Sequence, residues 1–389
     1  MNSATERAGA RGTDPSALGP LRRGRLGRYL LVSAVALIVL VAGYATYGYL
    51  ATQGHGTVLT IYTYPSFLGG GCGQNASTVF AGFERAHDVG LRFLCPAGTL
   101  AGTLIAEKSA PVADLVVGLD EVTTPQAEAA GVLVPYAPPA LASVSPSLAS
   151  ELSPDHAATP YEWGYLGFDA CGPFANSTPP ARQPSFPGFA TNSTLAGNLI
   201  VEDPTSDITG EEFLLWEIAF YTEVLHAPWA PWWSAVAPHV TTADSWGTAF
   251  SAFTCAPSAP QMVVSYLTDP AYAAAYGAPG SIASSGSWWN GTEYGWRSVY
   301  GAAIVRGSPH LGLDEAFLQA LLAGPVQAGL PTEEWEYPAN ATVPLPPVYQ
   351  DAPNVSGIVA LNGAIPPSSV AAQLPGWIDT WQATVNSAG

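Results

Sequence analysis

The segment ADLVVGLD, residues 113–120, is the stretch of the chain that decides its fold class. It is a nearly continuous apolar run that ends in an acidic residue, a pattern typical of a strand buried on both faces of a parallel sheet. Open α/β sheets bind their ligands just beyond the carboxyl ends of such strands, so Asp120 is a candidate binding residue. TVLTIYTY (57–64) and QMVVSY (261–266) likewise end at Tyr64 and Tyr266.

Strands and helices alternate along the rest of the chain, and no repeat of 20–50 residues is present, which predicts an α/β fold. We expect further strands at 163–168, 199–202 and 301–305, and helices at 78–87, 211–225, 314–322 and 377–385. Asp207 or Thr209 is positioned to cap the helix at 211–225. Proline-rich stretches at 137–160 and 172–190 are predicted to be surface loops.

Charge is distributed very unevenly along the 389 residues, whose formal net charge is −18. Six arginines and two acidic residues precede position 29, whereas six basic and 28 acidic residues follow position 50. An acidic surface repels phosphate backbones, which argues against nucleic-acid binding. The composition instead suits an exterior domain or one that gathers cations.

An uncharged run of 22 residues, 29–50, follows the arginines. At about 1.5 Å per residue this run spans a bilayer core of roughly 30 Å, so we expect a transmembrane anchor. The positive-inside rule places residues 1–28 in the cytoplasm as a basic tail and the rest of the chain outside the cell membrane. A cleaved signal peptide is the alternative, although the run is longer than the usual apolar core of such a peptide.

Six Asn-X-Ser/Thr sequons follow the span, which fits a glycosylated exterior domain. Their asparagines are Asn75, Asn176, Asn192, Asn290, Asn340 and Asn354.

Aromatic residues are a distinctive feature of the composition, with 12 Trp, 17 Tyr and 13 Phe. Several occur at predicted strand ends or in loops, where packing does not require them: Tyr62, Tyr64, Trp246, Tyr266, Tyr272, Trp335 and Tyr337. Together with Asp120 they suit a flat cationic ligand, because ring faces attract positive charge and a carboxylate supplies the counter-charge. The alternative is that most of these rings pack in the core or at its rim.

Motifs of hydrolases, zinc proteases and P-loop ATPases are absent, and the six histidines are scattered. We therefore predict no catalytic residue, no metal site and no resident cofactor.

Seven segments, in order, resemble the thiamine-binding proteins of ABC transporters, which are group II periplasmic binding proteins that share a fold with thiaminase I. The segments are LTIYTY (59–64), ADLVVGLD (113–120), WGYLGF (163–168), VEDP (201–204), VSYLTDPAY (264–272), LPTEEWEYP (330–338) and GWIDTW (376–381). They extend over essentially residues 57–385.

The resemblance implies a two-lobed periplasmic-binding-protein type II fold with a ligand cleft between the lobes. Lobe one would hold residues 57–162 and 305–389, and lobe two residues 163–304, with crossing strands near 163–168 and 292–304.

The resemblance also assigns roles to individual residues. Tyr64 and Tyr272 would flank one ring of thiamine, with Trp246 and Trp335 near the other. Tyr266 would line the pocket, and Asp120 would bind the aminopyrimidine.

One departure from the family concerns phosphate esters of thiamine, which the family can hold at small hydroxyl residues before a helix. Thr205 and Ser206 are present here, but Asp207, Glu211 and Glu212 add negative charge. We therefore expect free thiamine to be preferred, unless Asp207 only caps the helix and faces away or the acids only reflect a salt-adapted surface.

The four cysteines, Cys72, Cys95, Cys171 and Cys255, all follow the span and form no CxxC or CxxH motif, which favours two disulfides. Three pairings are possible. We favour Cys72–Cys95 and Cys171–Cys255, because this pairing keeps each bond within one proposed lobe.

The leading hypothesis is an anchored, monomeric receptor, not an enzyme, that delivers thiamine to a separate ABC permease and ATPase. A thiaminase-like transferase would need an activated thiol, and Cys72 is the thiol nearest the predicted cleft. A receptor for another cation, such as a polyamine, is the third possibility, for which we would expect carboxylates spread along the cleft.

Overall fold

A computed structural model of the chain describes residues 56–175 and 184–388. The chain divides into residues 1–56 and a larger unit, residues 57–389. The predicted cytoplasmic tail and transmembrane anchor lie outside the described residues. Within the described part of the chain, no helix has both the length and the hydrophobicity needed to span a bilayer.

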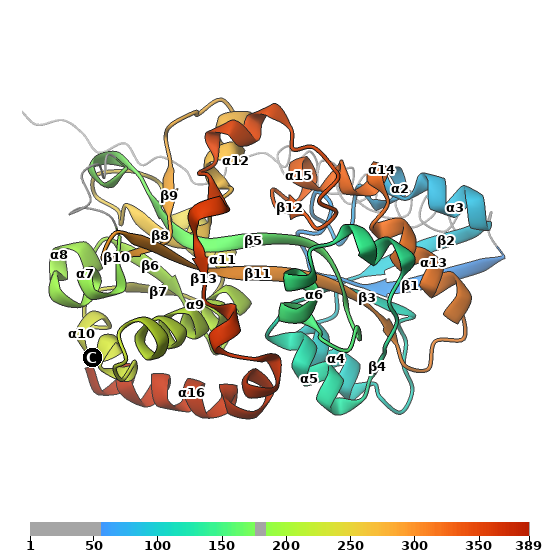
Figure 1. The fold of residues 1–389 in the computed structure, drawn as a ribbon, viewed down its shortest axis with the longest axis horizontal. Helices are drawn as coiled ribbons and strands as arrows, with labels where there is room; N and C mark the ends of the chain where they lie inside the picture. Colours follow the sequence, from blue (N-terminus) through green and yellow to red (C-terminus); the bar gives the residue numbers. More distant parts are fainter. Residues whose placement is uncertain (1–55, 176–183, 389) are drawn as a thin grey trace, which may run out of the picture. The chain divides into compact units, whose positions relative to one another are not determined.

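A mixed β-sheet forms the centre of the larger unit (Figure 1). In sheet order its main strands are β2 (Val89–Leu94), β1 (Thr57–Tyr62), β3 (Leu115–Leu119), β11 (Thr292–Val305), β5 (Thr159–Ala170), β8 (Met262–Tyr266), β6 (Leu199–Glu202) and β7 (Thr241–Ala243). Strands β1, β2 and β3 are parallel, as are β6, β7 and β8. Because β11 and β5 each pair antiparallel with their neighbours, the two parallel groups run in opposite directions.

The two longest strands, β5 and β11, are shared by both halves of the sheet (Figure 1). They pair with each other from Trp296 opposite Leu166 to Ala302 opposite Thr159. The carboxyl end of β11 also pairs with β3, and the carboxyl end of β5 pairs with β8. Both strands therefore cross from one half to the other, at the positions where the resemblance expects crossing strands.

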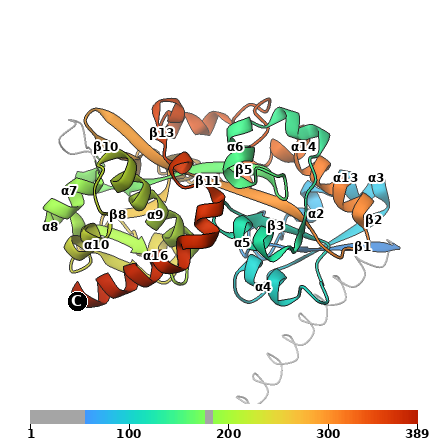
Figure 2. The same ribbon diagram turned by 60° about the horizontal axis from the view of Figure 1, so that its bottom comes forward.

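Fifteen helices are described besides short 3-10 turns, and they surround the sheet (Figures 1 and 2). Those before β5 are α2 (Ala76–Val79), α3 (Ala81–His87), α4 (Leu100–Ala106), α5 (Thr123–Ala130) and α6 (Pro146–Leu152). Between β5 and β11 lie α7 (Phe186–Thr191), α8 (Ser193–Ala196), α9 (Ile208–Ala219), α10 (Ala230–Val236), α11 (Trp246–Ala252) and α12 (Asp269–Ala275). After β11 come α13 (Leu311–Leu321), α14 (Gly324–Gln327), α15 (Leu330–Glu333) and α16 (Pro367–Ala388).

Short strands extend the sheet at its margins: β4 (Leu133–Val134), β9 (Ala283–Ser285), β10 (Ser287–Trp289), β12 (Tyr337–Pro338) and β13 (Val359–Ala360).

Two large apolar clusters lie on opposite halves of the sheet. The first gathers side chains of β1, β2, β3, α4 and α13, together with the carboxyl half of β11. The second gathers side chains of β6, β8, α7, α9 and α10, including Phe168, Trp216 and Trp233. Each half thus buries its own apolar core.

The C-terminal helix α16 joins the second cluster, where Val370, Leu374 and Trp381 are buried and α16 packs against α10 (Figure 2). The sequence-based division had grouped all of residues 305–389 with the first half. The difference has a simple cause, since α16 packs on α10, where Trp381 meets the buried Trp233 edge to face at 5.7 Å.

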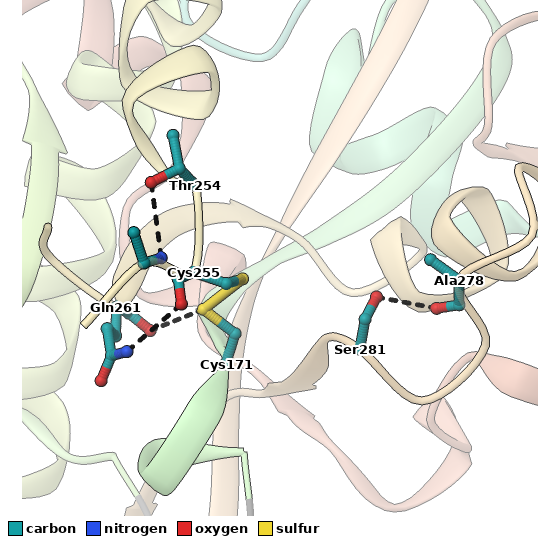
Figure 3. Close-up of a disulfide and its surroundings, with 7 residues drawn as sticks. Cys171, Thr254, Cys255, Gln261, Ala278 and Ser281 are labelled. Atoms are coloured by element: carbon teal, nitrogen blue, oxygen red, sulfur yellow. Dashed lines mark hydrogen bonds between the residues drawn. A yellow bond between two sulfur atoms is a disulfide. The ribbon is translucent and has the colours of Figure 1, made fainter. Parts of the chain in front are cut away.

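Both predicted disulfides are present: Cys72–Cys95 and Cys171–Cys255, with Cα atoms 5.7 and 5.6 Å apart. The second bond ties the end of β5 to the segment after α11 (Figure 3). The backbone N–H of Cys171 also donates to the carbonyl of Gln261 at 3.0 Å, so the bond closes a region that is already held by the sheet.

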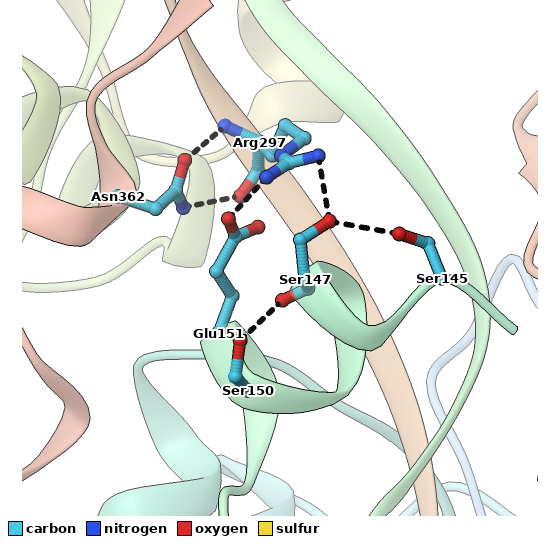
Figure 4. Close-up of polar contacts among 6 residues, drawn as sticks. All are labelled: Ser145, Ser147, Ser150, Glu151, Arg297 and Asn362. Atoms are coloured by element: carbon cyan, nitrogen blue, oxygen red, sulfur yellow. Dashed lines mark hydrogen bonds and ion pairs between the residues drawn. The ribbon is translucent and has the colours of Figure 1, made fainter.

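Three basic side chains of the larger unit, those of Arg297, Lys108 and Arg306, are held by other parts of the chain. Arg297 on β11 pairs with Glu151 on α6, and its guanidinium also donates to Ser147 (Figure 4). Its backbone exchanges hydrogen bonds with the side-chain amide of Asn362. Lys108 and Arg306 donate to backbone carbonyls.

The region 137–160, predicted to be a loop, contains α6 and a 3-10 helix at Pro139–Ser143. Both begin with proline at their first turn, where its missing N–H costs nothing. Likewise α7 occupies part of the second predicted loop, with Pro187 in its first turn. Proline here starts helices, and the loop predictions were wrong at these positions.

The sequon asparagines differ in exposure. Asn192, Asn290 and Asn354 are exposed, whereas Asn340 is buried and its amide donates to the carbonyl of Leu322 at 2.9 Å. A glycan on Asn340 would break that bond, so the folded domain does not offer this sequon. Asn176 lies outside the described residues.

Candidate ligand-binding site

Five of the seven predicted aromatic residues lie beside strands or on the helices that follow them, whereas Tyr62 and Tyr337 are buried. Tyr64 follows β1, Tyr266 ends β8, and Trp246 begins α11 shortly after β7. Tyr272 lies on α12, and Trp335 lies between α15 and β12. All five side chains are partly exposed, unlike the fully buried aromatic residues of the second core.

Four of the rings belong to one continuous aromatic group with Phe250. Trp246 stacks on Phe250 at 5.2 Å and meets Tyr266 at 6.4 Å. Phe250 meets Tyr272 at 6.2 Å, and Tyr272 meets Trp335 edge to face at 5.4 Å. Phe250 was not predicted as a site residue, although it lies one helical turn after Trp246 and so shares its face of α11.

Tyr300 of β11 connects this group to Tyr64. Its hydroxyl lies 2.9 Å from the hydroxyl of Tyr266, and its ring lies 6.0 Å from the ring of Tyr64. Tyr64 packs with the first apolar cluster and Tyr266 with the second. Aromatic side chains from both halves of the sheet therefore meet over the crossing strand. The sequence analysis missed Tyr300, because it falls within a strand where alternation alone predicts packing.

Trp246 is fixed at two atoms. Its indole N–H donates to Ser265 at 2.9 Å, and its backbone N–H donates to the carboxylate of Asp207 at 3.0 Å. The other oxygen of Asp207 accepts from the backbone N–H of Thr209 at 2.9 Å and caps α9, one of the two caps predicted. Asp207 therefore does not face away from the site but orients one of its rings.

Ser206 and Glu211 lie beside this cap. The Ser206 hydroxyl donates to the carbonyl of Asp244 at 2.8 Å. Burial, and then the charges of Asp120 and Asp207, raise the pKa of Glu211 to about 8. The start of α9 is thus already occupied by a carboxylate and flanked by a second acidic side chain.

Asp120 follows β3 and is buried. One carboxylate oxygen accepts from the backbone N–H groups of Val122 and Thr123, at 2.8 and 2.7 Å, and from the Thr123 hydroxyl at 3.0 Å. The described residues give its other oxygen no hydrogen bond. Burial raises the pKa of Asp120 to about 6 although these hydrogen bonds oppose the shift.

Glu121 and Glu212 join the two halves next to Asp120. Glu121 accepts from the indole N–H of Trp296 at 2.6 Å and from the backbone N–H of Val299 at 2.9 Å, both on β11. Glu212 of α9 accepts from Ser298 of the same strand at 2.7 Å. Burial, and then the charge of Asp120, raise the pKa of Glu121 to about 8; burial and Glu121 raise that of Glu212.

A second group of carboxyl side chains surrounds Tyr64. Its hydroxyl lies 3.0 Å from Glu162 and 2.8 Å from Glu334. Glu336 lies nearby against Gly164 of β5 and is buried. Sequence reasoning missed these acids, because three glutamates within four residues (333–336) give no local signal of burial.

The arrangement suits a cationic ligand better than an anionic one. All of these carboxyl side chains are buried except that of Glu334, which is half-buried, and each group lies beside rings whose faces attract positive charge. Arg297, Lys108 and Arg306 are engaged elsewhere. In the described part of the chain, no cluster of three or more His, Cys, Asp and Glu side chains has the arrangement of a metal site.

The thiol chemistry of a transferase has no nucleophile in this structure. Cys72 is bonded to Cys95, Cys171 is bonded to Cys255, and the chain has no further cysteine.

The chain was compared with protein families and with curated proteins. No family model matches the chain. The thiamine-binding periplasmic proteins of Brucella suis and Escherichia coli are each 27% identical to it, over 336 and 332 residues. That of Salmonella typhimurium is 28% identical over 330 residues, and the three alignments cover 84–85% of this chain and 92–94% of the relatives.

Solved structures agree in fold. A periplasmic thiamin binding protein superposes with a TM-score of 0.66 at 24% identity, covering 84% of this chain and 96% of its own. A ferric binding protein from Campylobacter jejuni gives 0.68 at 15% identity, and AfuA from Actinobacillus pleuropneumoniae, with fructose-6-phosphate bound, gives 0.67 at 17%. These cover 84–85% of this chain and 99% of their own. The chain therefore has the fold of the periplasmic binding proteins, and its sequence is similar to their thiamine-binding members.

Proposed function

We propose that residues 57–388 form an extracytoplasmic receptor that binds thiamine and delivers it to the permease and ATPase of an ABC transporter. The observation that carries the proposal is the meeting of aromatic rings from both halves of the sheet among buried carboxyl groups. The thiamine-binding relatives cover nearly the whole of the same region, which supports the same ligand.

Thiamine combines a cationic thiazolium ring with an aminopyrimidine. In this proposal Tyr64 and Tyr272 flank one ring, Trp246 and Trp335 lie near the other, and Tyr266 lines the pocket. Each ring contact with a cation contributes about 0.5–2 kcal/mol. The unbonded oxygen of Asp120 accepts from the exocyclic amine, and charge-assisted bonds of this kind are among the stronger ones.

The two apolar clusters support a division into two lobes with a hinge at β5 and β11. We propose that lobe one holds residues 57–162 and 305–345, and that lobe two holds residues 163–304 and the C-terminal segment 361–388. Ligand binding then closes the lobes, and the closed form docks on the permease as a monomer.

Free thiamine is the preferred ligand in this proposal. A phosphate ester needs hydrogen-bond donors or positive charge, such as a free helix N-terminus. Here Asp207 already caps α9, and Glu211 lies beside it. The added phosphate charge would meet acidic side chains and no free cap.

We also propose that residues 29–50 anchor the receptor in the cell membrane, with residues 1–28 in the cytoplasm and the binding domain outside. The paired cysteines fit an oxidising compartment. Of the six sequons, the exposed Asn192, Asn290 and Asn354 are the sites open to glycosylation.

A polyamine is the second candidate ligand, and one observation favours it. The acids Glu121, Glu212, Glu162, Glu334 and Glu336 extend along both sides of the crossing strands, as an extended polycation would require. The aromatic group still favours a flat ring system, because a polyamine offers no surface to stack on.

Isothermal titration of the purified protein with thiamine, its mono- and diphosphate, and spermidine tests these alternatives. We expect the tightest binding for thiamine and weaker binding for each added phosphate. Absence of heat with thiamine, together with a clear response to spermidine, would overturn the proposal in favour of the second candidate.

A further inference from the structure

The hydroxyl of Tyr64 is surrounded by three oxygen atoms. It lies 2.8 Å from Glu334, 3.0 Å from Glu162 and 3.2 Å from the hydroxyl of Tyr161. Glu162 and Tyr161 belong to β5, whereas Glu334 directly follows α15. The second oxygen of Glu334 accepts from the backbone N–H of Leu68, in the loop after Tyr64. One carboxyl group therefore holds both the ring and its loop.

A count of protons shows that these contacts cannot all involve ionised acids. A phenol oxygen carries one hydrogen, and an ionised carboxylate only accepts. Tyr64 can donate to Glu162 or to Glu334 but not to both. The contact with the other becomes a hydrogen bond only if that carboxyl group carries a proton and donates it to the Tyr64 oxygen.

The surroundings keep that proton in place near neutral pH. Burial raises the pKa of Glu334 to about 7, and burial followed by the charge of Glu334 raises that of Glu162 well above its usual range. Glu333 of α15 adds negative charge beside Glu334. Glu336 is buried as well, and burial followed by the charges of Glu162 and Asp269 raises its pKa well above its usual range. Glu333 itself accepts from Asn75 at 2.8 Å and takes no part in the bonds of Tyr64.

We propose that Glu334 and Glu162 are positioning residues, which hold the ring of Tyr64 in its stacking orientation through one proton shared among the two carboxyl groups and the Tyr64 hydroxyl. The inference rests on the proposed function in one respect, since it takes Tyr64 as a ring that contacts the ligand. When the proton is lost, two carboxylates compete for a single phenol hydrogen, and the hold on Tyr64 weakens.

The test compares Glu334→Gln, which keeps an uncharged donor and acceptor, with Glu334→Ala, which removes both. Thiamine affinity should stay within about threefold of the parent in Glu334→Gln at pH 6 and fall at least tenfold in Glu334→Ala. As the pH rises from 6 to 8.5, Glu334→Gln should bind progressively better relative to the parent, because its uncharged amide does not ionise. The control Glu223→Gln removes a charge from an exposed position outside this group of acids and should follow the parent at every pH.

Three results would overturn the proposal. The first is parent-like affinity in Glu334→Ala. The second is a ratio of Glu334→Gln affinity to parent affinity that does not change with pH. The third is a ratio that falls as the pH rises, which would mean that the charge of Glu334 only attracts the cationic ligand. Tyr64→Phe should remove most of the difference between Glu334→Gln and Glu334→Ala, because both act through the hydroxyl.

A measurement without ligand separates this proposal from the function. Because the pKa of Glu334 is higher in the folded than in the unfolded chain, its stabilising contribution is complete at low pH and is lost as the pH rises through about 7. The melting temperature of Glu334→Gln should therefore rise relative to the parent between pH 5 and 8, whereas that of the control Glu223→Gln should run parallel to the parent. If the parent binds no thiamine but this difference in melting temperature appears, the proposed function fails and the shared proton is supported. If the melting temperatures of all three proteins change with pH in parallel, the shared proton is refuted.

Discussion

At the scale of single residues, the site depends on rings held in unusual positions. Trp335 has a φ of +61°, in the left-handed region that non-glycine residues rarely adopt. Such a conformation persists only where the surroundings enforce it, and it often accompanies function. Here the neighbouring Glu334 is bound to Tyr64, and Trp335 contacts Tyr272.

Replacing Trp335 or Asp120 tests the ligand assignment directly. Trp335→Ala should weaken thiamine binding by about 0.5–2 kcal/mol, the value of one cation–π contact. Asp120→Asn should cost about 1.5–3 kcal/mol, because a hydrogen bond to a charged group is lost. Titration calorimetry measures both, with Trp335→Phe as the control that keeps a ring; parent-like affinity in Trp335→Ala and Asp120→Asn would remove both residues from the site.

Gly118 offers a second test, because the ring of Tyr64 packs directly on it. A Cβ atom at Gly118 would lie 2.3 Å from the Tyr64 ring, at a φ of +109°. Gly118→Ala should therefore displace Tyr64, lower stability by about 1–3 kcal/mol and weaken thiamine binding. Gly131→Ala is the matched control, since Gly131 also has a positive φ, +68°, but open space around it. Equal loss of binding in both variants would show that backbone strain, and not contact with Tyr64, is responsible.

The residues of the site were predictable to different degrees. Tyr64, Tyr266 and Asp120 follow apolar strands, and the rule for open sheets is enough to select them. Tyr300 and Phe250 lie within a strand and a helix, where their spacing gives no reason to separate them from core residues. Glu162 and Glu334 come together only through the tertiary fold, which no local pattern reveals.

At the scale of elements, α9 links helix capping to ligand choice. Asp207 caps α9 with one oxygen and holds the backbone of Trp246 with the other. Asparagine caps helices about as well as aspartate, so Asp207→Asn removes the charge and keeps the cap.

We expect Asp207→Asn to lower stability by about 0.5–1.5 kcal/mol, because its amide nitrogen cannot accept from the backbone N–H of Trp246, and to improve binding of thiamine monophosphate relative to thiamine. Asp207→Ala should lower stability further, by about 0.5–2 kcal/mol for the lost cap alone. Thermal melting and competition binding measure the two effects. Asn192→Ala, which removes the cap of α8 far from any ring of the site, controls for loss of a cap alone. An unchanged preference in Asp207→Asn would show that its charge does not select against phosphate.

Strands with long apolar runs were predicted correctly, whereas a helix rich in proline, serine and alanine was predicted to be a loop. The strands β1, β3 and β8 were expected within two residues of their observed ends, because buried parallel strands have few alternatives. The helix α6 was missed, because proline, serine and alanine together suggest a loop unless the proline is recognised as a first-turn residue.

At the scale of the whole molecule, many acids are buried without cations beside them, and this determines how stability depends on pH. Burial raises the pKa of Glu121 and Glu211 to about 8, far above the ordinary glutamate value of 4.5. A raised folded-state pKa contributes stability that is complete below the unfolded value and is lost as the pH rises through the folded value.

The ligand-free protein should therefore become less stable as the pH increases from about 5 to 8.5. Reversible denaturation at several pH values measures this loss. Glu121→Gln should show a smaller loss than the parent, whereas Glu223→Gln, at an exposed position, should show the same loss. A stability that rises over this range would show that these carboxyl groups are ionised in the folded protein at neutral pH.

The overall topology could be predicted from the order of the seven segments that resemble the family, and β5 and β11 lie where crossing strands were expected. The return of α16 to the second apolar cluster was not, because a terminal amphipathic helix carries no signal for which of two surfaces it covers.

The pairing of all four cysteines also has a practical consequence. A single cysteine introduced at the exposed Thr332, three residues from Trp335, would be the one thiol open to a maleimide dye. A fluorophore attached there would report occupancy of the aromatic group as a change in emission, turning the domain into a reagentless vitamin sensor without disturbing its crosslinks.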